Sequence, residues 1–323
     1  MSPALVAVEQ VREAARRLAG VAVRTPLLPA PWLSEQVGGA EVRLKCENLQ
    51  RVGAFKMRGA YNALAVLPEA QRRRGVITAS SGNHGQALAL AARMFGVPAV
   101  VVMPENAPAV KVEGVRGYGA EVVFAGRTSP ERFRKAHELV EERGLVMIPP
   151  FDDARVIAGQ GTVGLEILEE WPEVENILVP IGGGGLLAGV AALVKREKPS
   201  CKVIGVEPEN SCCMRRSLDA GEPTSIEVRG SVADGLLPSR PGDLTFAHAR
   251  ALVDDVVLVD EDAIVHATRA LLVQSKILVE FSGAVTVAAL SSGAFEPTGP
   301  TAAVLSGGNM DPGRIRALLE LKP

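Results

Sequence analysis

The sequence has little of what proteins use to bind nucleic acids or anionic membranes. Aromatic residues make up only 4% of the 323 residues, and the formal net charge is -2. Proteins that bind a phosphate backbone normally carry a clear excess of Lys and Arg, and single strands stack on aromatic side chains. We therefore predict neither a nucleic acid nor an anionic membrane surface as a partner.

Cysteine is also scarce. The four cysteines are Cys46, Cys201, Cys212 and Cys213. None of them pair at the spacing of a zinc site, and a bridge between the neighbours Cys212 and Cys213 would be strained. This usage is typical of the reducing cytosol, where cysteine serves as a small apolar residue. The chain also begins with an amphipathic helical pattern and not with a signal peptide, so we expect a cytoplasmic protein.

Long apolar runs are missing as well. Residues 177–194 carry no charge, and this length approaches that of a membrane-spanning helix. Pro180 and the glycines at 182–185 divide the stretch into a short strand, a loop and a helix. We therefore expect no membrane span.

What the chain does contain is a regular alternation of two patterns. Its composition, 47% hydrophobic and 22% charged, is typical of a globular protein, and its length suits about two domains. Runs rich in Val and Ile predict strands at 76–79, 99–103, 121–124, 145–148, 177–181, 203–206, 256–259 and 302–305. Between them, helical periodicity is clearest at 86–95, 131–142, 186–196 and 263–272.

This alternation predicts an α/β fold with largely parallel sheets that are covered by helices on both faces. We expect two doubly wound domains. Residues 1–68 and 148–323 would form the larger one, and residues 69–147 a smaller inserted one. Functional loops in such sheets lie at the carboxyl ends of the strands.

Lys56 has surroundings that suit a reactive amine. It lies in the segment G-A-F-K-M-R-G at 53–59, between an aromatic residue and a thioether, with glycines on both sides. A lysine in a partly apolar niche loses its proton readily and can act as a nucleophile. The alternative is an ordinary solvated lysine at the start of a helix.

The glycine run at 182–185 follows a predicted strand and is followed by Leu186 at the start of a predicted helix. Backbone without Cβ atoms can surround an anion with N–H groups, and a helix N-terminus favours negative charge, so we predict a phosphate site here. A flexible turn is the simpler alternative. A second alternative is a nicotinamide dinucleotide site, because Gly183, Gly185 and Ala188 fit the looser fingerprint and Glu207 follows at the ribose position.

Two further polar loops follow predicted strands. The segment S-S-G-N-H-G at 80–85 offers hydroxyls, an amide and backbone N–H groups that suit a carboxylate and a phenolic oxygen, although simple helix capping is the alternative. Ser306 follows the strand at 302–305 and could pair with a ring nitrogen.

Taken together and in order, these segments resemble the fold-type II pyridoxal-phosphate enzymes, most closely the serine/threonine dehydratases and serine racemases. The matching segments are K-C-E-N at 45–48 with G-A-F-K-M-R-G-A at 53–60, S-S-G-N-H-G-Q-A at 80–87, G-G-G-G-L at 182–186 and L-S-G-G-N at 305–309. The similarity extends from about Thr25 to Asn309. It implies a tryptophan synthase β-like fold with the cofactor in the cleft between the two domains.

The resemblance also implies roles for single residues. Lys56 would carry pyridoxal phosphate as a Schiff base and act as the catalytic base, and a Ser81 hydroxyl on the opposite face would be the second catalytic group. The residues expected to bind the cofactor are Lys56, Phe55, Asn83, Gly182, Gly183, Gly184, Gly185, Leu186, Glu280 and Ser306. Those expected to bind the substrate carboxylate are Ser80, Ser81, Gly82 and His84.

Within that family, Asn83 would bond the phenolic oxygen of the cofactor, and Ser306 would face its ring nitrogen. The implied reaction is β-elimination of a small hydroxy amino acid, L-threonine and also L-serine, to a 2-oxo acid and ammonia. Serine racemase or hydroxyaspartate dehydratase activity is the alternative in the same family. An NAD-binding oxidoreductase or a non-catalytic binder on the same fold are alternatives of other classes, and the intact lysine argues against the last.

The resemblance further implies a homo-oligomer, a dimer or tetramer. Cation-dependent relatives carry an acidic cluster after the position of Glu207, whereas this chain has N-S-C-C at 210–213. Because cysteine replaces a hard oxygen ligand there, we expect no bound metal ion.

Overall fold

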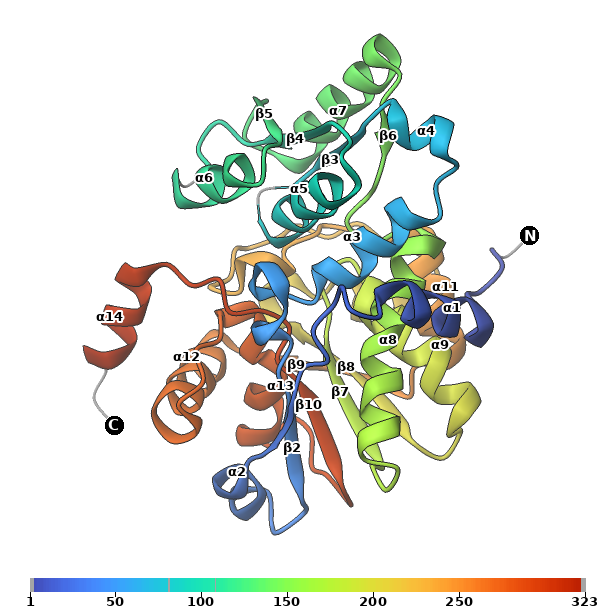
Figure 1. Cartoon of the computed structure of the whole chain (residues 1–323). Coiled ribbons are helices and arrows are strands. Elements are labelled where there is room, and N and C mark those ends of the chain that lie inside the picture. The colour runs from blue at the N-terminus through green and yellow to red at the C-terminus, as the bar shows by residue number, and fades with distance from the viewer. Residues whose placement is uncertain (1–2, 81, 108, 321–323) are drawn as a thin grey trace.

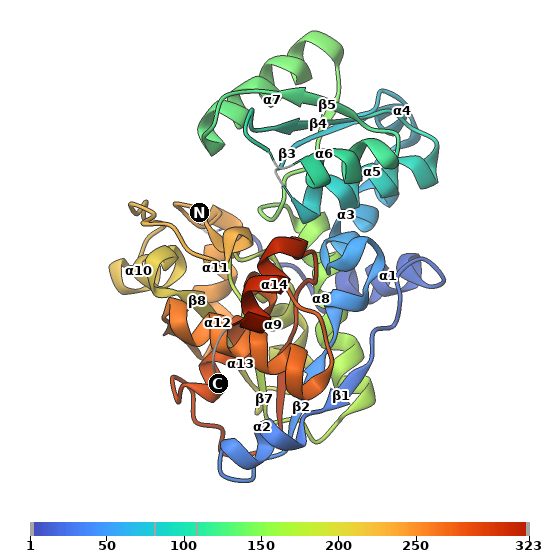
Figure 2. The same cartoon turned by 90° about the vertical axis from the view of Figure 1, so that its left-hand side faces the viewer.

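The computed structural model describes residues 3–80, 82–107 and 109–320, and it confirms an α/β fold with two mostly parallel sheets (Figures 1 and 2). The strands are β1 (Leu27–Pro29), β2 (Val42–Lys45), β3 (Val76–Ala79), β4 (Ala99–Met103), β5 (Glu121–Phe124), β6 (Val146–Met147), β7 (Asn176–Pro180), β8 (Lys202–Pro208), β9 (Asp255–Val259) and β10 (Thr301–Val304). The helices up to the end of the four-stranded sheet are α1 (Val8–Leu18), α2 (Pro31–Gln36), η1 (Glu47–Leu49), η2 (Arg51–Gly53), α3 (Lys56–Ala65), α4 (Glu69–Arg73), α5 (Asn83–Phe95), α6 (Ala109–Gly117) and α7 (Ser129–Arg143). Those that follow are α8 (Ala154–Glu170), α9 (Gly185–Glu197), η3 (Glu209–Ser211), α10 (Cys213–Ala220), η4 (Asp234–Leu236), α11 (Asp243–Leu252), α12 (Glu261–Ala270), η5 (Leu271–Ser275), α13 (Phe281–Ser291) and α14 (Pro312–Glu320).

The larger sheet has six strands in the order β1-β2-β10-β7-β8-β9, and only the β1–β2 pair is antiparallel. Its last strand along the chain, β10, lies between β2 and β7, near the middle of the sheet. Alternate residues of β7 face opposite sides: Ile177 and Val179 pack with α8 and α9, whereas Leu178 packs with α12 and α13. Helices thus cover both faces of this sheet, as uninterrupted apolar strands predict.

The smaller sheet has four parallel strands in the order β5-β4-β3-β6. In β4, Val101 and Met103 pack with α5 on one face, and Val100 and Val102 pack with α7 on the other. The start of α7 is fixed by Glu131, whose Oε2 accepts from the backbone N–H of Thr128 over 2.8 Å and from its hydroxyl over 2.7 Å. In Figure 1 this sheet and its helices lie above the larger sheet.

Helix α3 lies between the two sheets and packs on both α5 and α8. A Cβ atom on Gly159 of α8 would be 2.6 Å from the Arg58 carbonyl oxygen and 2.7 Å from the Cα atom of Gly59, so the two backbones are in direct contact. The contact between α8 and α9 is equally close, because a Cβ on Gly189 would be 2.3 Å from the Ile157 carbonyl oxygen. Glycines at these crossings bring α3 and α9, which carry two of the predicted site segments, onto the same helix.

The strand predictions at 76–79, 99–103 and 121–124 coincide with β3, β4 and β5, and the other five are shifted or resized by one or two residues at an end. The pattern missed β1 and β2. Strand β2 carries Arg43 and Lys45 among its apolar residues, and Lys45 is buried only because it finds an ion-pair partner on α8. In the part of the chain that is described, no helix is both long and apolar enough to cross a membrane. The division at residues 69 and 147 stays a prediction.

Candidate active site

Lys56 is the first residue of α3 and lies partly buried. Its Nζ donates a hydrogen bond of 2.7 Å to the carbonyl oxygen of Pro150. The ring of Phe55 lies beside it, with its centroid 5.0 Å from Nζ. Burial lowers the pKa of Lys56 from 10.5 to about 8, because the charged form loses hydration. The amine can therefore lose its proton at mildly alkaline pH, as a nucleophilic lysine must.

The glycine run at 182–185 lies between the end of β7 and the first turn of α9. Gly184 has a φ of 93°, a left-handed conformation that a side chain would strain. The ring of Phe151 packs so closely on Gly183 that a Cβ there would be 2.2 Å from the ring. Phe151 directly follows the carbonyl that accepts from the lysine amine. One loop therefore contacts both the lysine and the glycine run.

Ser306 lies beyond the carboxyl end of β10, next to β7 in the sheet, and is buried. Its carbonyl oxygen accepts from the N–H of Phe55 over 3.1 Å, and Ala54 forms an antiparallel bridge with Gly307. Its Oγ donates to the Ser282 carbonyl oxygen over 3.4 Å. These contacts fix the end of β10 alongside the segment that leads to the reactive lysine.

A chain of side-chain hydrogen bonds connects the start of α5 with this strand end. Asn309 Nδ2 donates to Asn83 Oδ1 over 2.9 Å, and Asn83 Nδ2 donates to Glu280 Oε1 over 2.6 Å. The N–H of Glu280 in turn donates to the carbonyl oxygen of Gly307 over 3.0 Å. Burial raises the pKa of Glu280 to about 7, so this acid is close to half-protonated at neutral pH.

The polar loop after β3 is organised by Ser80. Its Oγ accepts from the N–H groups of Gly82 over 3.3 Å and of Gly85 over 3.2 Å. Gly82 is the residue before α5, so the loop ends on the N-terminus of a helix, whose first N–H groups have no acceptor within the helix. Ser81, predicted as a catalytic and substrate-binding residue, lies outside the described residues.

His84 is almost fully buried, at 2% exposure. Its Nε2 lies 3.1 Å from the Ile148 carbonyl oxygen and must carry the proton there, since a carbonyl only accepts. Burial and the nearby charge of Lys56 lower the pKa of His84 to about 3, so the ring is neutral. A neutral ring with its N–H engaged is a poor ligand for a carboxylate. If His84 binds the substrate, its backbone N–H is the better donor.

Glu207 carried the alternative of a nicotinamide site, and its surroundings argue against that role. Both carboxylate oxygens are buried and accept from the N–H groups of Met214 and Arg215, over 2.8 Å each, at the start of α10. A ribose hydroxyl would have to displace one of these bonds. Among residues 3–80, 82–107 and 109–320, no group of three His, Cys, Asp or Glu is placed to hold a metal ion.

Comparison with known proteins decides the family. Residues 18–307 match the sequence profile of the family described as pyridoxal-phosphate dependent enzyme. The chain belongs to this family. An L-threonine ammonia-lyase from Thermotoga maritima is 45% identical over 315 residues, which cover 98% of this chain and 78% of that protein. The catabolic L-threonine dehydratase TdcB of Escherichia coli K12 is 45% identical over 313 residues, which cover 96% of this chain and 95% of that one.

Solved structures agree on the fold. Maize serine racemase superposes with a TM-score of 0.94 at 39% identity, over 98% of this chain and 97% of that chain. The cofactor of this family has an aldehyde, a phosphate and a ring nitrogen, groups that chemically suit an amine, a glycine-rich helix N-terminus and a hydroxyl, respectively.

The residues present fit pyridoxal phosphate. The glycine run presents N–H groups at the start of α9, where a phosphate is favoured, and only glycine fits against Phe151 at Gly183. The amine of Lys56 has the lowered pKa that a Schiff base needs, Ser306 is a buried polar residue, and Asn83 is hydrogen-bonded to the buried Glu280.

Other contacts at the site were not predicted. The Pro150 carbonyl that accepts from Lys56 is a main-chain atom and leaves no trace in a residue pattern. Thr245, whose Oγ1 donates to the Gly183 carbonyl oxygen over 2.7 Å, lies in α11 far along the chain. Asn309 did have a signal, because it ends the glycine motif that follows β10.

Proposed function

We propose that this chain is a threonine ammonia-lyase that converts L-threonine to 2-oxobutyrate and ammonia and also accepts L-serine. The observation that carries the proposal is the Lys56 amine, which has a lowered pKa and bonds to the Pro150 carbonyl, in the same loop whose Phe151 packs on the glycine run. The relatives that are 45% identical over nearly the whole chain are a threonine ammonia-lyase and a threonine dehydratase, and they support the choice of substrate.

In this proposal residues from several parts of the chain hold the cofactor. Gly182, Gly183, Gly184, Gly185 and Leu186 would hold the phosphate, Asn83 the phenolic oxygen and Ser306 the ring nitrogen. Phe55 would line the site, and Glu280 would act through its hydrogen bond with Asn83. Bound pyridoxal phosphate supplies an electron sink for the electrons released when the α-proton leaves.

The substrate carboxylate would bind at the start of α5, at Ser80, Ser81, Gly82 and the N–H of His84. Lys56 Nζ, uncharged above about pH 8, would then take the α-proton. The Pro150 carbonyl oxygen orients the amine by accepting a hydrogen bond from one of its N–H groups, which leaves the nitrogen lone pair free. Loss of the β-hydroxyl follows, and hydrolysis yields the 2-oxo acid and ammonia.

Product analysis tests the proposal. The purified enzyme with pyridoxal phosphate should form 2-oxobutyrate from L-threonine and pyruvate from L-serine, and borohydride should attach the cofactor to Lys56. Lys56→Ala should lower turnover by about 10³-fold, the range of a lost acid–base group. A colourless protein that does not bind added pyridoxal phosphate but binds NAD would contradict both the proposed lyase activity and the proposed cofactor site.

Serine racemase activity is the second candidate, and the similarity to maize serine racemase favours it. A Ser81 hydroxyl would return the proton in that reaction. The same assay separates the two activities: D-serine accumulating without comparable pyruvate would replace the lyase by a racemase. Turnover of 3-hydroxyaspartate in preference to threonine would indicate a hydroxyaspartate dehydratase.

We further propose that the enzyme acts in the cytoplasm as a homo-oligomer and needs no divalent cation. All four cysteines are free and buried, which suits a reducing compartment. Light scattering on the full-length protein should give a dimer or tetramer, and chelation should leave the activity unchanged. A monomer, or loss of activity that magnesium restores, would contradict the respective part.

A further inference from the structure

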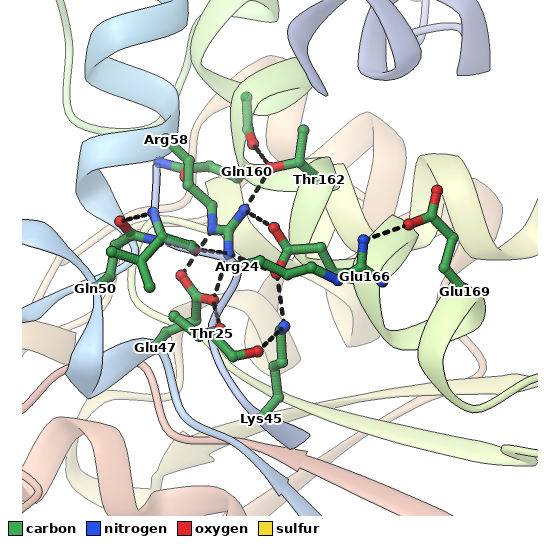
Figure 3. A network of polar contacts seen from close by, with 12 residues as sticks. Arg24, Thr25, Lys45, Glu47, Gln50, Arg58, Gln160, Thr162, Glu166 and Glu169 are labelled. Atoms are coloured by element: carbon green, nitrogen blue, oxygen red, sulfur yellow. Dashed lines mark hydrogen bonds and ion pairs between the residues drawn. The ribbon is translucent and has the colours of Figure 1, made fainter. Parts of the chain in front are cut away.

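A cluster of buried charges surrounds the side chain of Arg58, in the first turn of α3 (Figure 3). Its members are Arg58, Glu47, Lys45 and Glu166, whose side chains are 1%, 0%, 0% and 13% exposed. Two positive and two negative groups balance each other. The cluster is outside the site proposed for the cofactor, and the reaction makes no use of its charges.

Arg58 is the centre of the cluster. Its Nε and Nη2 donate to the two carboxylate oxygens of Glu47, over 2.8 Å each. Its Nη1 and Nη2 donate to the two oxygens of Glu166, over 2.6 and 2.8 Å, and Nη1 also donates to Thr162 Oγ1 over 3.1 Å. The guanidinium therefore makes a bidentate contact with each carboxylate, a geometry that the ammonium group of a lysine cannot reproduce.

The partners of Arg58 come from separate parts of the fold. Glu47 lies in η1, just after β2 of the six-stranded sheet, and Glu166 lies in α8. Lys45, the last residue of β2, donates to Glu166 Oε2 over 2.6 Å and to the Thr25 carbonyl oxygen over 2.6 Å. The cluster thus ties α3 to the end of a strand and to a neighbouring helix at one point.

Stability alone does not account for such a cluster. Removing buried ions from water is costly, and well-packed apolar residues often replace an ion network with no loss of stability. Apolar contacts, however, have no preferred direction, whereas hydrogen bonds do. A guanidinium that makes four hydrogen bonds to carboxylates on two elements, and a fifth to the Thr162 hydroxyl, fixes the helix that carries it, both along its axis and about it.

Lys56 is two residues before Arg58 on the same helix. Since each residue advances an α-helix by about 100°, their side chains point roughly 200° apart, to opposite sides. The residue before α3, Phe55, has no side-chain cap that would anchor the helix end. Arg58 therefore holds the first turn of α3 from the side opposite to the one that carries the Lys56 amine.

We propose that Arg58 is the positioning residue for Lys56, and that its paired contacts with Glu47 and Glu166 fix the amine against the Pro150 carbonyl. The proposal rests on Lys56 being the reactive amine of the proposed function. Arg58 itself touches neither substrate nor cofactor. Its effect is carried by the first turn of α3.

Arg58→Lys tests the positioning role, because lysine keeps the positive charge but cannot make bidentate hydrogen bonds to both Glu47 and Glu166. Two quantities are measured on the full-length protein. The first is the pH at which Lys56 half-reacts with an amine reagent after removal of the cofactor, followed by peptide mass spectrometry. The second is kcat and KM with the cofactor bound.

We expect the half-labelling pH to rise from about 8 toward 10.5, because a loosened first turn lets water reach the amine. We also expect kcat to fall by about 10²-fold, the effect of displacing a reacting group by about 1 Å, with KM changed less than about threefold. The labelling result does not depend on threonine being the substrate. It therefore still tests the positioning role if the proposed activity fails.

Arg24→Gln is the matched control. It removes the ion pair with Glu169 next to the cluster, where the side chains are 54% and 49% exposed, and it should change neither quantity. If Arg58→Lys does not fold, Thr162→Val replaces it, since it removes one hydroxyl that accepts from Arg58 at nearly constant volume. Thr162→Val should shift both quantities in the same direction by less, and Thr162→Ser should restore them.

The proposal is overturned if Arg58→Lys or Thr162→Val lowers the thermal midpoint while the half-labelling pH stays within about 0.3 units and kcat within about twofold of the wild type. The cluster would then serve stability alone.

Discussion

Glu280 carries the clearest consequence at the scale of a single residue. It is buried, its only side-chain partner among the described residues is Asn83, and its pKa is raised to about 7 from 4.5. Between these two values the folded protein binds a proton that the unfolded chain releases. The free energy of unfolding therefore falls as the pH rises from about 4.5 to about 7, because burying the carboxylate becomes progressively more costly.

Glu280→Gln should remove this dependence, since its amide oxygen can still accept from Asn83. We expect the variant to match the wild type near pH 4.5 and to be more stable at pH 8, by on the order of 3 kcal/mol. Urea unfolding of the cofactor-free protein at several pH values measures the difference. Two curves that stay parallel from pH 4.5 to pH 8 would show that Glu280 is not held protonated.

At the scale of elements, the glycine crossings decide how closely the helices approach. A Cβ on Gly189 of α9 would lie 2.3 Å from the Ile157 carbonyl oxygen and 2.5 Å from the Gly161 N atom of α8. Backbone atoms cannot move aside as a flexible side chain can. Any residue larger than glycine must push α8 and α9 apart, and α9 carries the glycine run at its start.

Gly189→Ala should therefore lower the free energy of unfolding by about 3 kcal/mol, the upper part of the usual range for overpacking. Gly117→Ala is the matched control, because an added Cβ there meets no atom within 4 Å and the backbone is helical. That control should be neutral or slightly stabilising, by up to about 0.5 kcal/mol. Urea unfolding compares the two, and equal midpoints would contradict the tight crossing.

At the scale of the whole molecule, an ion pair joins a helix beside the four-stranded sheet to a short turn near the glycine run. Lys111 of α6 donates to Asp234 of η4 over 3.0 Å, and Gly235 in η4 donates through its N–H to Ser282 Oγ over 2.8 Å. The carbonyl oxygen of Gly235 also lies close to Gly182 of the glycine run. The pair thus connects a helix of the four-stranded sheet with the surroundings of the glycine run.

Breaking this pair should loosen α6 without unfolding the protein. Lys111→Met should speed amide hydrogen exchange in α6 about fivefold, which corresponds to the roughly 1 kcal/mol of a partly exposed pair. High salt should have a similar effect on the wild type, since it screens the pair. Exchanging the charges, with Lys111→Asp and Asp234→Lys together, should restore slow exchange. Unchanged exchange in Lys111→Met would show that other contacts hold α6.

How far the sequence could be interpreted differs between these scales. Uninterrupted Val and Ile runs predict buried parallel strands, and glycine-rich segments after them predict the site edge, because both depend on neighbours along the chain. The Arg58 cluster could not be predicted, since Glu47 and Glu166 meet it only in three dimensions and a lone charge suggests solvent. Strand β2 was missed for the same reason, since the charge of Lys45 suggests solvent and its partner Glu166 is distant in the sequence. The Pro150 carbonyl is a main-chain atom, so no side chain indicates it.

The position of β10 also sets the order in which the molecule can assemble during synthesis. The strands of the four-stranded sheet all leave the ribosome within one stretch, from Val76 to Met147. In the six-stranded sheet, β2 and β7 must wait for Thr301 to Val304 before they gain a common neighbour. At roughly 5–20 residues per second, the wait after β7 lasts on the order of ten seconds, and two inner strand edges stay open to wrong pairing throughout it.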